Sequence, residues 1–314
     1  MEYFFVRFWM KGEGPFIQGE AVADREIKSL GLLTDSFNAV FVREVLPGLE
    51  RAVAGKPVKL ELIEMQELSA PEKNRHMERL ALEHRVDALV ICHLPFNSRQ
   101  AALFVEAQIP VGYLAGRLEG VDWCMVDEIQ GSYEATRHLL AMGHRRLALV
   151  SGPPVALESR LREDGFLRAL KEAGMSLDRG SDVKIVNFSE NEGYEAGHLL
   201  MQMANAPTGV FCSAGDLTCL GLMAAFREWG LLLPRDLSLV GYDGLSFTEH
   251  LDPPLTTVKQ PLARMAEDLA ERVIRRLLEP GSQAPRGELY EPRLIVRHST
   301  AYPLDHQPAT APVL

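Results

Sequence analysis

Short runs of hydrophobic residues alternate along the chain with longer segments whose hydrophobic positions recur every three or four residues, from Leu30 onward. The short runs are rich in Val, Ile and Leu and are almost unbroken by polar residues. This pattern is typical of parallel strands that are buried on both faces. The strands that we predict are Leu30–Thr34, Val58–Ile63, Ala88–Cys92, Val111–Leu114, Leu147–Ser151, Val183–Asn187, Gly209–Cys212 and Leu237–Tyr242.

The segments between these runs carry helical periodicity. Between Phe41 and Ala54, hydrophobic residues recur at four-residue spacing and so lie on one helix face. A second helix is predicted at Ser132–Met142, with Gly143 as its C-terminal cap. Strands and helices that alternate in this way predict an α/β fold in which each sheet is parallel and doubly wound, with helices on both faces.

Length and composition extend this picture. A chain of 314 residues that is 46% hydrophobic exceeds one usual α/β core, so two lobes are expected. Residues 1–28, in which Gly12, Gly14 and Pro15 interrupt any helix, are predicted to form an appendage of uncertain structure. The Pro- and Ala-rich residues 304–314 are predicted to be a disordered tail.

Charge and cysteine usage exclude several classes of protein. The formal charge of -10 argues against DNA binding by these residues alone, because a phosphate backbone attracts cations. The cysteines lie in apolar surroundings without a C-x-x-C pair, which predicts buried free thiols rather than a zinc site or disulfides. The sequence lacks a convincing secretion signal and an apolar run long enough for a membrane helix, so we expect a cytoplasmic protein without membrane contact.

Polar residues follow the ends of the predicted strands, where ligands bind in open parallel sheets. They include Asp35 after the first strand, Arg162 shortly after the fifth and Asp243 after the last. Carboxylates and a guanidinium form directional, charge-assisted hydrogen bonds that suit a polar ligand. Simpler alternatives stay open, because Asp35 and Asp216 also fit helix N-caps and Phe188 also fits a core position.

A catalytic function is not indicated. The chain lacks the common nucleophile, phosphate-binding, metalloprotease and dinucleotide motifs, and its histidines are scattered. We therefore predict that the protein is not an enzyme and uses no cofactor or metal, with His93 and His144 in structural or surface positions.

Ordered motifs then identify a family. The blocks Leu30–Glu50, Ala135–Gly152, Pro253–Pro261 and Leu294–Thr300 resemble the LacI/GalR family of transcription regulators. Ser159–Phe166 resembles that family's S-x-R-x-R-x-x-G-F block, and Leu239–Gly244 resembles its V-G-Y-D element.

The resemblance implies a periplasmic-binding-protein-like (type I) fold of two lobes joined by three crossing segments. These crossings are expected near Trp123–Asp127, Val258–Pro261 and Leu289–Glu291, which places the N-terminal lobe at 29–124 plus 260–289 and the C-terminal lobe at 125–259 plus 290–303. It also implies that an effector binds between the lobes. The ligand-binding residues expected by this resemblance and by position are Asp35, Phe41, Arg162, Phe188, Asp216 and Asp243.

The implied function is a homodimeric regulator whose operator affinity changes when a sugar, sugar phosphate or nucleoside/purine effector binds. The family's helix-turn-helix headpiece is not recognisable in residues 1–28, which contain four basic and five acidic residues. Operator contact is therefore expected only through a headpiece not seen in this chain. The alternative is a stand-alone cytoplasmic sensor without DNA binding, and the sequence leaves effector identity open.

Overall fold

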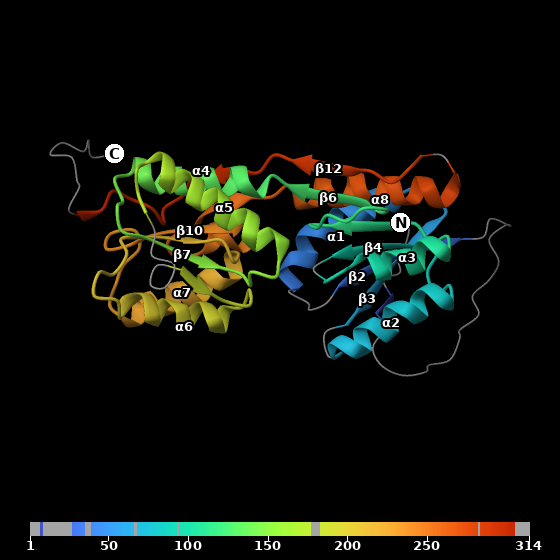
Figure 1. Ribbon diagram of the computed structural model, residues 1–314, viewed down its shortest axis with the longest axis horizontal. Helices are drawn as coiled ribbons and strands as arrows, with labels where there is room; N and C mark the ends of the chain where they lie inside the picture. The colour runs from blue at the N-terminus through green and yellow to red at the C-terminus, as the bar shows by residue number, and fades with distance from the viewer. Residues whose placement is uncertain are drawn as a thin grey trace. The chain divides into compact units, whose positions relative to one another are not determined.

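The chain folds into two compact α/β units (Figure 1). The computed structural model describes residues 7–8, 27–34, 39–65, 68–92, 94–176, 183–281 and 283–304. Unit 1 comprises Met1–Met125 and Pro261–Tyr290, and unit 2 comprises Val126–Gln260 and Glu291–Leu314. The chain passes between them after residues 125, 260 and 290.

Unit 1 is built on a seven-stranded sheet, counted over the described residues, with the order β1-β3-β2-β4-β5-β6-β12. Helices α1 and α8 pack together, as do α2 and α3. The strands are β1 (Arg7–Phe8), β2 (Lys28–Thr34), β3 (Val58–Glu64), β4 (Ala88–Cys92), β5 (Val111–Leu114), β6 (Asp122–Val126) and β12 (Gly287–Tyr290), and the helices are α1 (Ala39–Val53), α2 (Ala70–Leu82), α3 (Ser98–Glu106) and α8 (Leu262–Leu278).

Unit 2 is built on a six-stranded sheet in the described part of the chain, with the order β13-β11-β10-β9-β7-β8. Its strands are parallel except that β13 runs antiparallel to β11. The strands are β7 (Leu147–Ser151), β8 (Val183–Ile185), β9 (Gly209–Cys212), β10 (Ser238–Asp243), β11 (Thr256–Lys259) and β13 (Arg293–Ile295). The helices are α4 (Glu128–Ala141), α5 (Leu157–Glu172), α6 (Glu190–Met201), α7 (Asp216–Glu228) and the 3-10 helix η1 (Ser246–His250).

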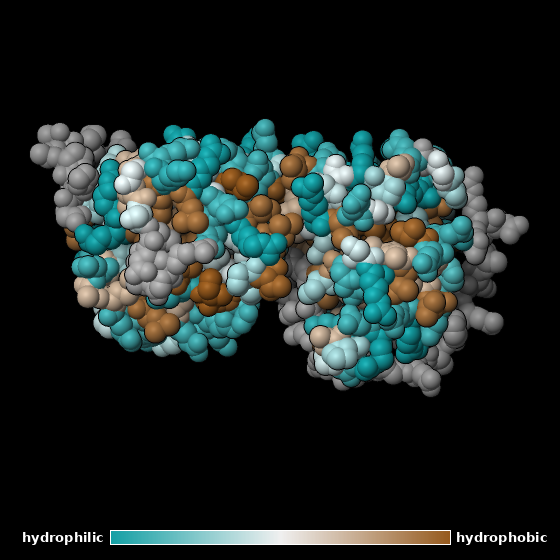
Figure 2. All heavy atoms as spheres, viewed as in Figure 1, coloured by the Kyte–Doolittle hydropathy of each residue, from teal (hydrophilic) through white to brown (hydrophobic). Residues whose placement is uncertain are grey.

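The two faces of the unit 2 sheet are covered by different helix pairs (Figure 1). Phe166 of α5 packs with Phe211 and Tyr242 of the sheet in one core cluster. Leu222 and Phe226 of α7 belong to a second cluster on other strand residues. This is the doubly wound α/β arrangement predicted from the sequence. Hydrophilic side chains dominate the visible face of each unit, and hydrophobic residues lie in small groups among them (Figure 2).

All eight predicted strands are present, and the helices predicted at Phe41–Ala54 and Ser132–Met142 correspond to α1 and α4, each of which ends one residue earlier than predicted. Gly143 ends α4 in the left-handed region, at φ 91°, as a C-terminal glycine should. The strand predicted at Val183–Asn187 stops at Ile185. Asn187 instead donates its backbone N–H to the Glu192 side chain at 2.6 Å, and Phe188 then turns the chain at φ 57°.

The four cysteines are buried and free, as predicted. Burial raises the pKa of the Cys124 thiol to about 12, so this group is unreactive at neutral pH. His144 is also buried, and its ring nitrogens lie 3.0 Å from the hydroxyls of Thr208 and Ser238. These contacts give His144 the structural position expected for it.

A cluster of buried and partly buried charges ties α8 to the adjacent strands β6 and β12 of unit 1. Arg272 lies 7% exposed and donates to Glu288 of β12 at 2.5 Å. Asp122 of β6, 2% exposed, accepts from Arg276 at 2.9 Å. Because each of these buried charges has an opposite partner, the cluster fixes where β6 and β12 meet α8.

Among the described helices, none is both long and apolar enough to cross a bilayer.

Close helix contact in unit 1 depends on one glycine. Gly48 of α1 faces α8, and a Cβ added at Gly48 would overlap the carbonyl oxygen of Ala263. The neighbouring atoms are backbone, so they cannot move without displacing a helix.

We predict that Gly48→Ala destabilises unit 1 by about 1–3 kcal/mol, because overpacking outweighs the better helix propensity of Ala. Urea unfolding followed by far-UV circular dichroism measures this loss. Glu50→Ala, at an exposed position of the same helix, is the control and should change stability by less than about 0.5 kcal/mol. Equal stability of Gly48→Ala and the natural protein would contradict the packing argument.

Candidate functional site

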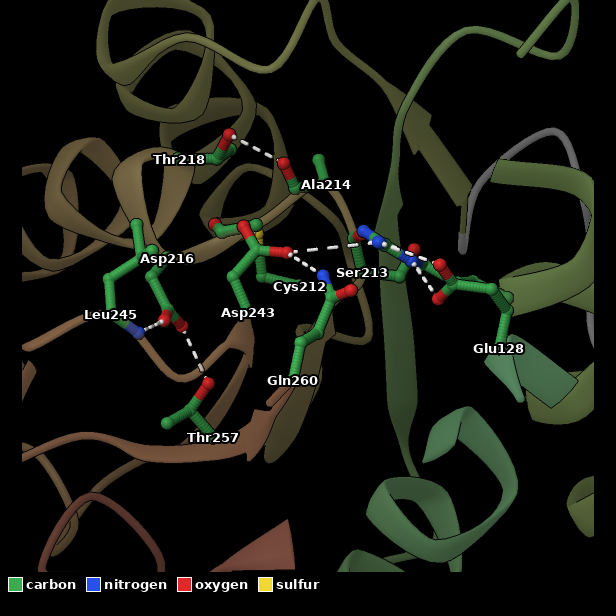
Figure 3. A network of polar contacts seen from close by, with 12 residues as sticks. Glu128, Cys212, Ser213, Ala214, Asp216, Thr218, Asp243, Leu245, Thr257 and Gln260 are labelled. Atoms are coloured by element: carbon green, nitrogen blue, oxygen red, sulfur yellow. Dashed lines mark hydrogen bonds and ion pairs between the residues drawn. The ribbon is translucent and has the colours of Figure 1, made fainter. Parts of the chain in front are cut away.

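Polar groups gather where the parallel strands of unit 2 end (Figure 3). Ser213 follows β9, Asp243 is the last residue of β10, and Gln260 follows β11. Since β9, β10 and β11 are neighbours in the sheet, their carboxyl ends bring these three residues to one edge. Arg162 from α5 and Glu128 from the start of α4 complete the group.

Arg162 is held by protein oxygens on two sides. Its Nε donates to Glu128 Oε2 at 2.8 Å, its Nη2 donates to Glu128 Oε1 at 3.3 Å, and its Nη1 donates to the Ser213 carbonyl at 2.8 Å. Its guanidinium carbon also lies 3.8 Å from the centre of the Tyr242 ring, within the range of a cation–π contact. The guanidinium is therefore fixed before any ligand arrives.

The electrostatic setting keeps Arg162 charged although its side chain is only 7% exposed. Burial alone would lower the pKa of Arg162, but Glu128, Tyr242 and Asp243 together outweigh burial and raise it above the ordinary value. The two N–H groups that Glu128 accepts also satisfy its own buried oxygens.

Asp243 has an unusual backbone and an unusual carboxyl group. Its φ is 105°, a region that Asp and Asn enter more readily than most residues. Gln260 donates to its Oδ1 at 2.8 Å, and Arg162 Nη2 lies 3.7 Å from the same oxygen. Burial raises the pKa of Asp243 to about 6, although Arg162 and Gln260 oppose this shift.

Asp216 lies at the first turn of α7 and is fully buried. Its Oδ1 accepts from the Thr257 hydroxyl at 2.7 Å, and its Oδ2 accepts from the Leu245 backbone N–H at 2.8 Å. Burial and the nearby Asp243 carboxylate raise the pKa of Asp216. These bonds hold the segment after β10 in place. The N-cap of α7 is Gly215, so the helix N-cap that the sequence left open for Asp216 is wrong.

Phe188 projects at the end of β8, at φ 57°, and its side chain is partly exposed. A Cβ at Gly152 would overlap the Phe188 ring and lie 2.5 Å from the Ser159 hydroxyl oxygen. Gly152 therefore leaves room for the Phe188 ring near Ser159 of α5, which lies three residues before Arg162. The Ser159 hydroxyl is buried and has no hydrogen-bond partner among the described residues.

Two of the predicted ligand residues, Phe41 and Asp35, belong to unit 1. Phe41 lies in α1 and is 5% exposed, and Asp35 lies outside the described residues. The structure brings Arg162, Asp243 and Asp216 into one network, with Phe188 near Ser159 of the same helix that carries Arg162.

Glu128 and Gln260, whose side chains form hydrogen bonds with Arg162 and Asp243, were missed by the sequence analysis. Glu128 comes directly after β6 and Asp127, and Gln260 directly after β11. Neither strand was predicted, so the residues that follow them were not considered. The rule that polar residues after parallel strands are candidates would have found Gln260, had Thr256–Lys259 been recognised as a strand.

The arrangement can bind and orient a polar molecule. Arg162 offers donors, Asp243 offers an acceptor and Phe188 offers an apolar face, which together suit a ligand with hydroxyl groups and a ring. Within the described ranges, no three His, Cys, Asp or Glu side chains are grouped to hold a metal ion. The fold and this set of residues define a periplasmic-binding-protein-like module.

Comparison with known proteins agrees with this class. Residues 136–300 match the family model described as a periplasmic binding protein-like domain. The HTH-type transcriptional repressor PurR of Klebsiella pneumoniae (strain 342) is 30% identical over 278 residues, which cover 87% of this chain and 80% of that protein. The PurR of Glaesserella parasuis serovar 5 is 29% identical over 279 residues, covering 87% of this chain and 81% of its own length.

Solved structures give the same answer. A complex of the transcriptional regulator CelR with cellobiose has a TM-score of 0.78 and 29% identity, covering 88% of this chain and 86% of its own. A LacI family transcriptional regulator from Enterococcus faecium with bound ribose has a TM-score of 0.76 and 26% identity, covering 88% and 99%. The chain belongs to the LacI/GalR family of transcription regulators and contains its effector-binding region.

The raised pKa of Asp243 has a consequence for stability. Because the carboxyl group is harder to ionise in the folded than in the unfolded protein, stability falls as the pH rises from about 4 to about 6 and then stays level. The charged groups around Asp243 are Arg162, Glu128 and Asp216.

We predict that Asp243→Asn stabilises the ligand-free protein by about 1–2 kcal/mol at pH 7.5, after allowance for solvent screening, and by much less at pH 4.5. Asn keeps an oxygen for Gln260 and tolerates the positive φ. Thermal unfolding across this pH range measures the difference. A stabilisation of the same size at both pH values would show that ionisation of Asp243 is not its cause.

Proposed function

We propose that this protein is a cytoplasmic regulator whose unit 2 strand-end site binds a small polar effector, such as a sugar, sugar phosphate or nucleoside/purine, and thereby changes the affinity of a homodimer for operator DNA. The observation that carries this proposal is the fixed Arg162 guanidinium beside Asp243, 3.7 Å away, at the edge where ligands bind in open parallel sheets. We infer that the site binds its ligand without turnover.

Each residue has a separate role in this proposal. Arg162 donates to ligand oxygens, Asp243 accepts from ligand hydroxyls, and Phe188 lies against an apolar ring face. We propose that Asp216 acts mainly by holding the segment that follows Asp243, since both of its oxygens already accept protein hydrogen bonds. Asp35 and Phe41 stay proposed contacts from unit 1.

The relatives support a regulator in preference to the stand-alone sensor. The PurR proteins are named repressors, the CelR structure contains cellobiose, and the Enterococcus faecium regulator contains ribose. Family membership together with these ligands makes sugars and purines the first compounds to test.

We predict that Arg162→Lys and Asp243→Asn each abolish the thermal stabilisation that an identified effector gives the natural protein. A ligand at 100 times its Kd stabilises by about 2.7 kcal/mol, which corresponds to roughly 5–10 °C for a unit of this size. Lys keeps the charge of Arg162 but loses its fork of donors. Differential scanning fluorimetry with sugars, sugar phosphates, nucleosides and purines makes the measurement.

Arg160→Lys and Asp164→Asn are matched controls on the same helix. Arg160 is exposed and donates to the carbonyls of Pro154 and Val155, and Asp164 is also exposed. Both controls should keep the full ligand-induced shift. An undiminished shift in Arg162→Lys and Asp243→Asn would refute the site assignment.

We also predict a homodimer at micromolar concentration, because regulators of this family act through paired half-sites. Light scattering coupled to size-exclusion chromatography gives the molar mass directly. A mass equal to the 34.9 kDa of one chain would contradict the dimer.

A further inference from the structure

The positive charge of Arg162 is already matched inside unit 2. Glu128 faces the Nε–Nη2 edge of the guanidinium with both oxygens, at 2.8 and 3.3 Å. The Glu128 side chain is 2% exposed and that of Arg162 is 7% exposed, so solvent screens this pair weakly. Arg162 therefore presents hydrogen-bond donors without an excess of positive charge.

The geometry of the guanidinium also limits which ligands it can accept. An arginine has five N–H donors in a planar fork. Glu128 takes two of them, the Ser213 carbonyl takes a third, and the Tyr242 ring covers one face of the group. A phosphate or carboxylate prefers a bidentate fork, and one edge of this fork is already filled by Glu128.

Asp243 is the charged group of this network that remains most accessible. Its side chain is 17% exposed, more than those of Arg162 and Glu128. Figure 3 shows Asp243 beside Gln260, whose amide nitrogen binds one carboxylate oxygen and whose own oxygen is buried without a partner among the described residues. Gln260 adds no charge, and Glu128 balances Arg162. The groups that face a ligand at this site therefore carry a net negative charge, which comes from Asp243.

We propose that Glu128 determines effector specificity by neutralising the positive charge of Arg162. The site then selects neutral or cationic ligands that are rich in hydroxyl groups and rejects phosphorylated and carboxylated ligands. This inference rests on the proposed function and narrows its ligand class. Glu128 acts through Arg162 and is a positioning residue. An anionic ligand would meet the Asp243 carboxylate without a free cation to compensate it, and burying an unpaired charge is strongly unfavourable.

The test uses inorganic phosphate as the probe, because it requires no knowledge of the effector. Binding is measured by isothermal titration calorimetry at constant ionic strength, with chloride in the reference buffer. Glu128→Gln keeps the shape of the side chain and removes its charge. We expect its affinity for phosphate to exceed that of the natural protein at least about tenfold, which equals about 1.4 kcal/mol.

Two further variants test whether the gained phosphate affinity depends on Arg162 and on the position of the charge that is removed. Arg162→Lys in the Glu128→Gln background should remove the gained affinity, because Lys lacks the fork. Glu134→Gln makes the same charge change at a partly exposed position of α4, where Glu134 pairs with Gln130 and Arg137, and it should leave phosphate affinity unchanged.

A variant outside the ion pair keeps the test decisive if Glu128→Gln folds poorly. Asp243→Asn removes the accessible acid and leaves Glu128 in place, and it should also strengthen phosphate binding in an Arg162-dependent way. The inference is overturned if a folded Glu128→Gln binds phosphate no more tightly than the natural protein does, or, where Glu128→Gln does not fold, if Asp243→Asn gains no affinity.

A different result would contradict the proposed function. A natural protein that binds none of the screened sugars, nucleosides or purines contradicts the proposed effector class, whatever the phosphate titrations give. Once a neutral effector is found, its phosphorylated derivative should bind at least about tenfold more weakly to the natural protein, and Glu128→Gln should reduce this ratio.

Discussion

The buried ion pair between Arg162 and Glu128 is the interaction on which the rest of the site depends. It joins α5 to the first turn of α4, and the Ser213 carbonyl joins the same guanidinium to the end of β9. Removing either partner would leave a buried charge uncompensated, at a cost of about 3–5 kcal/mol. The pair thus sets the position of Arg162 and the charge that remains for a ligand, and Asp243 and Gln260 are arranged around it.

Most of the fold could be predicted because its central strands are unambiguous. Ala88–Cys92 and Leu147–Ser151 are buried at every position, and an unbroken hydrophobic run is the expected signature of such strands. Most of the strands that escaped prediction are polar or lie at sheet edges, whereas β6 is neither. Thr256–Lys259 has two threonines and a lysine, and Arg293–Ile295 is a short antiparallel strand. Their stability comes from pairing with neighbours, which no local pattern records.

The candidate site was predictable only in part, for a related reason. Arg162 and Asp243 were found because they lie in recognisable motifs beside well-marked strands. Glu128 and Gln260 follow unpredicted strands, and their importance depends on contacts across 34 and 17 residues of sequence. A carboxylate that neutralises an arginine from another helix cannot be recognised from spacing, because the pairing exists only after both helices pack.

The backbone at Asp243 limits how this surface can evolve. At φ 105° a β-branched or bulky side chain would be strained, so few replacements besides Asn and Gly are accessible in one step. A lineage that acquires a new effector would therefore be expected to keep the acid at 243 and to vary the groups that surround it. Glu128 is the first residue of an ordinary helix and has no such backbone restriction, so the limit there is the buried charge of Arg162. A lineage that replaces Glu128 must also provide another partner for that charge.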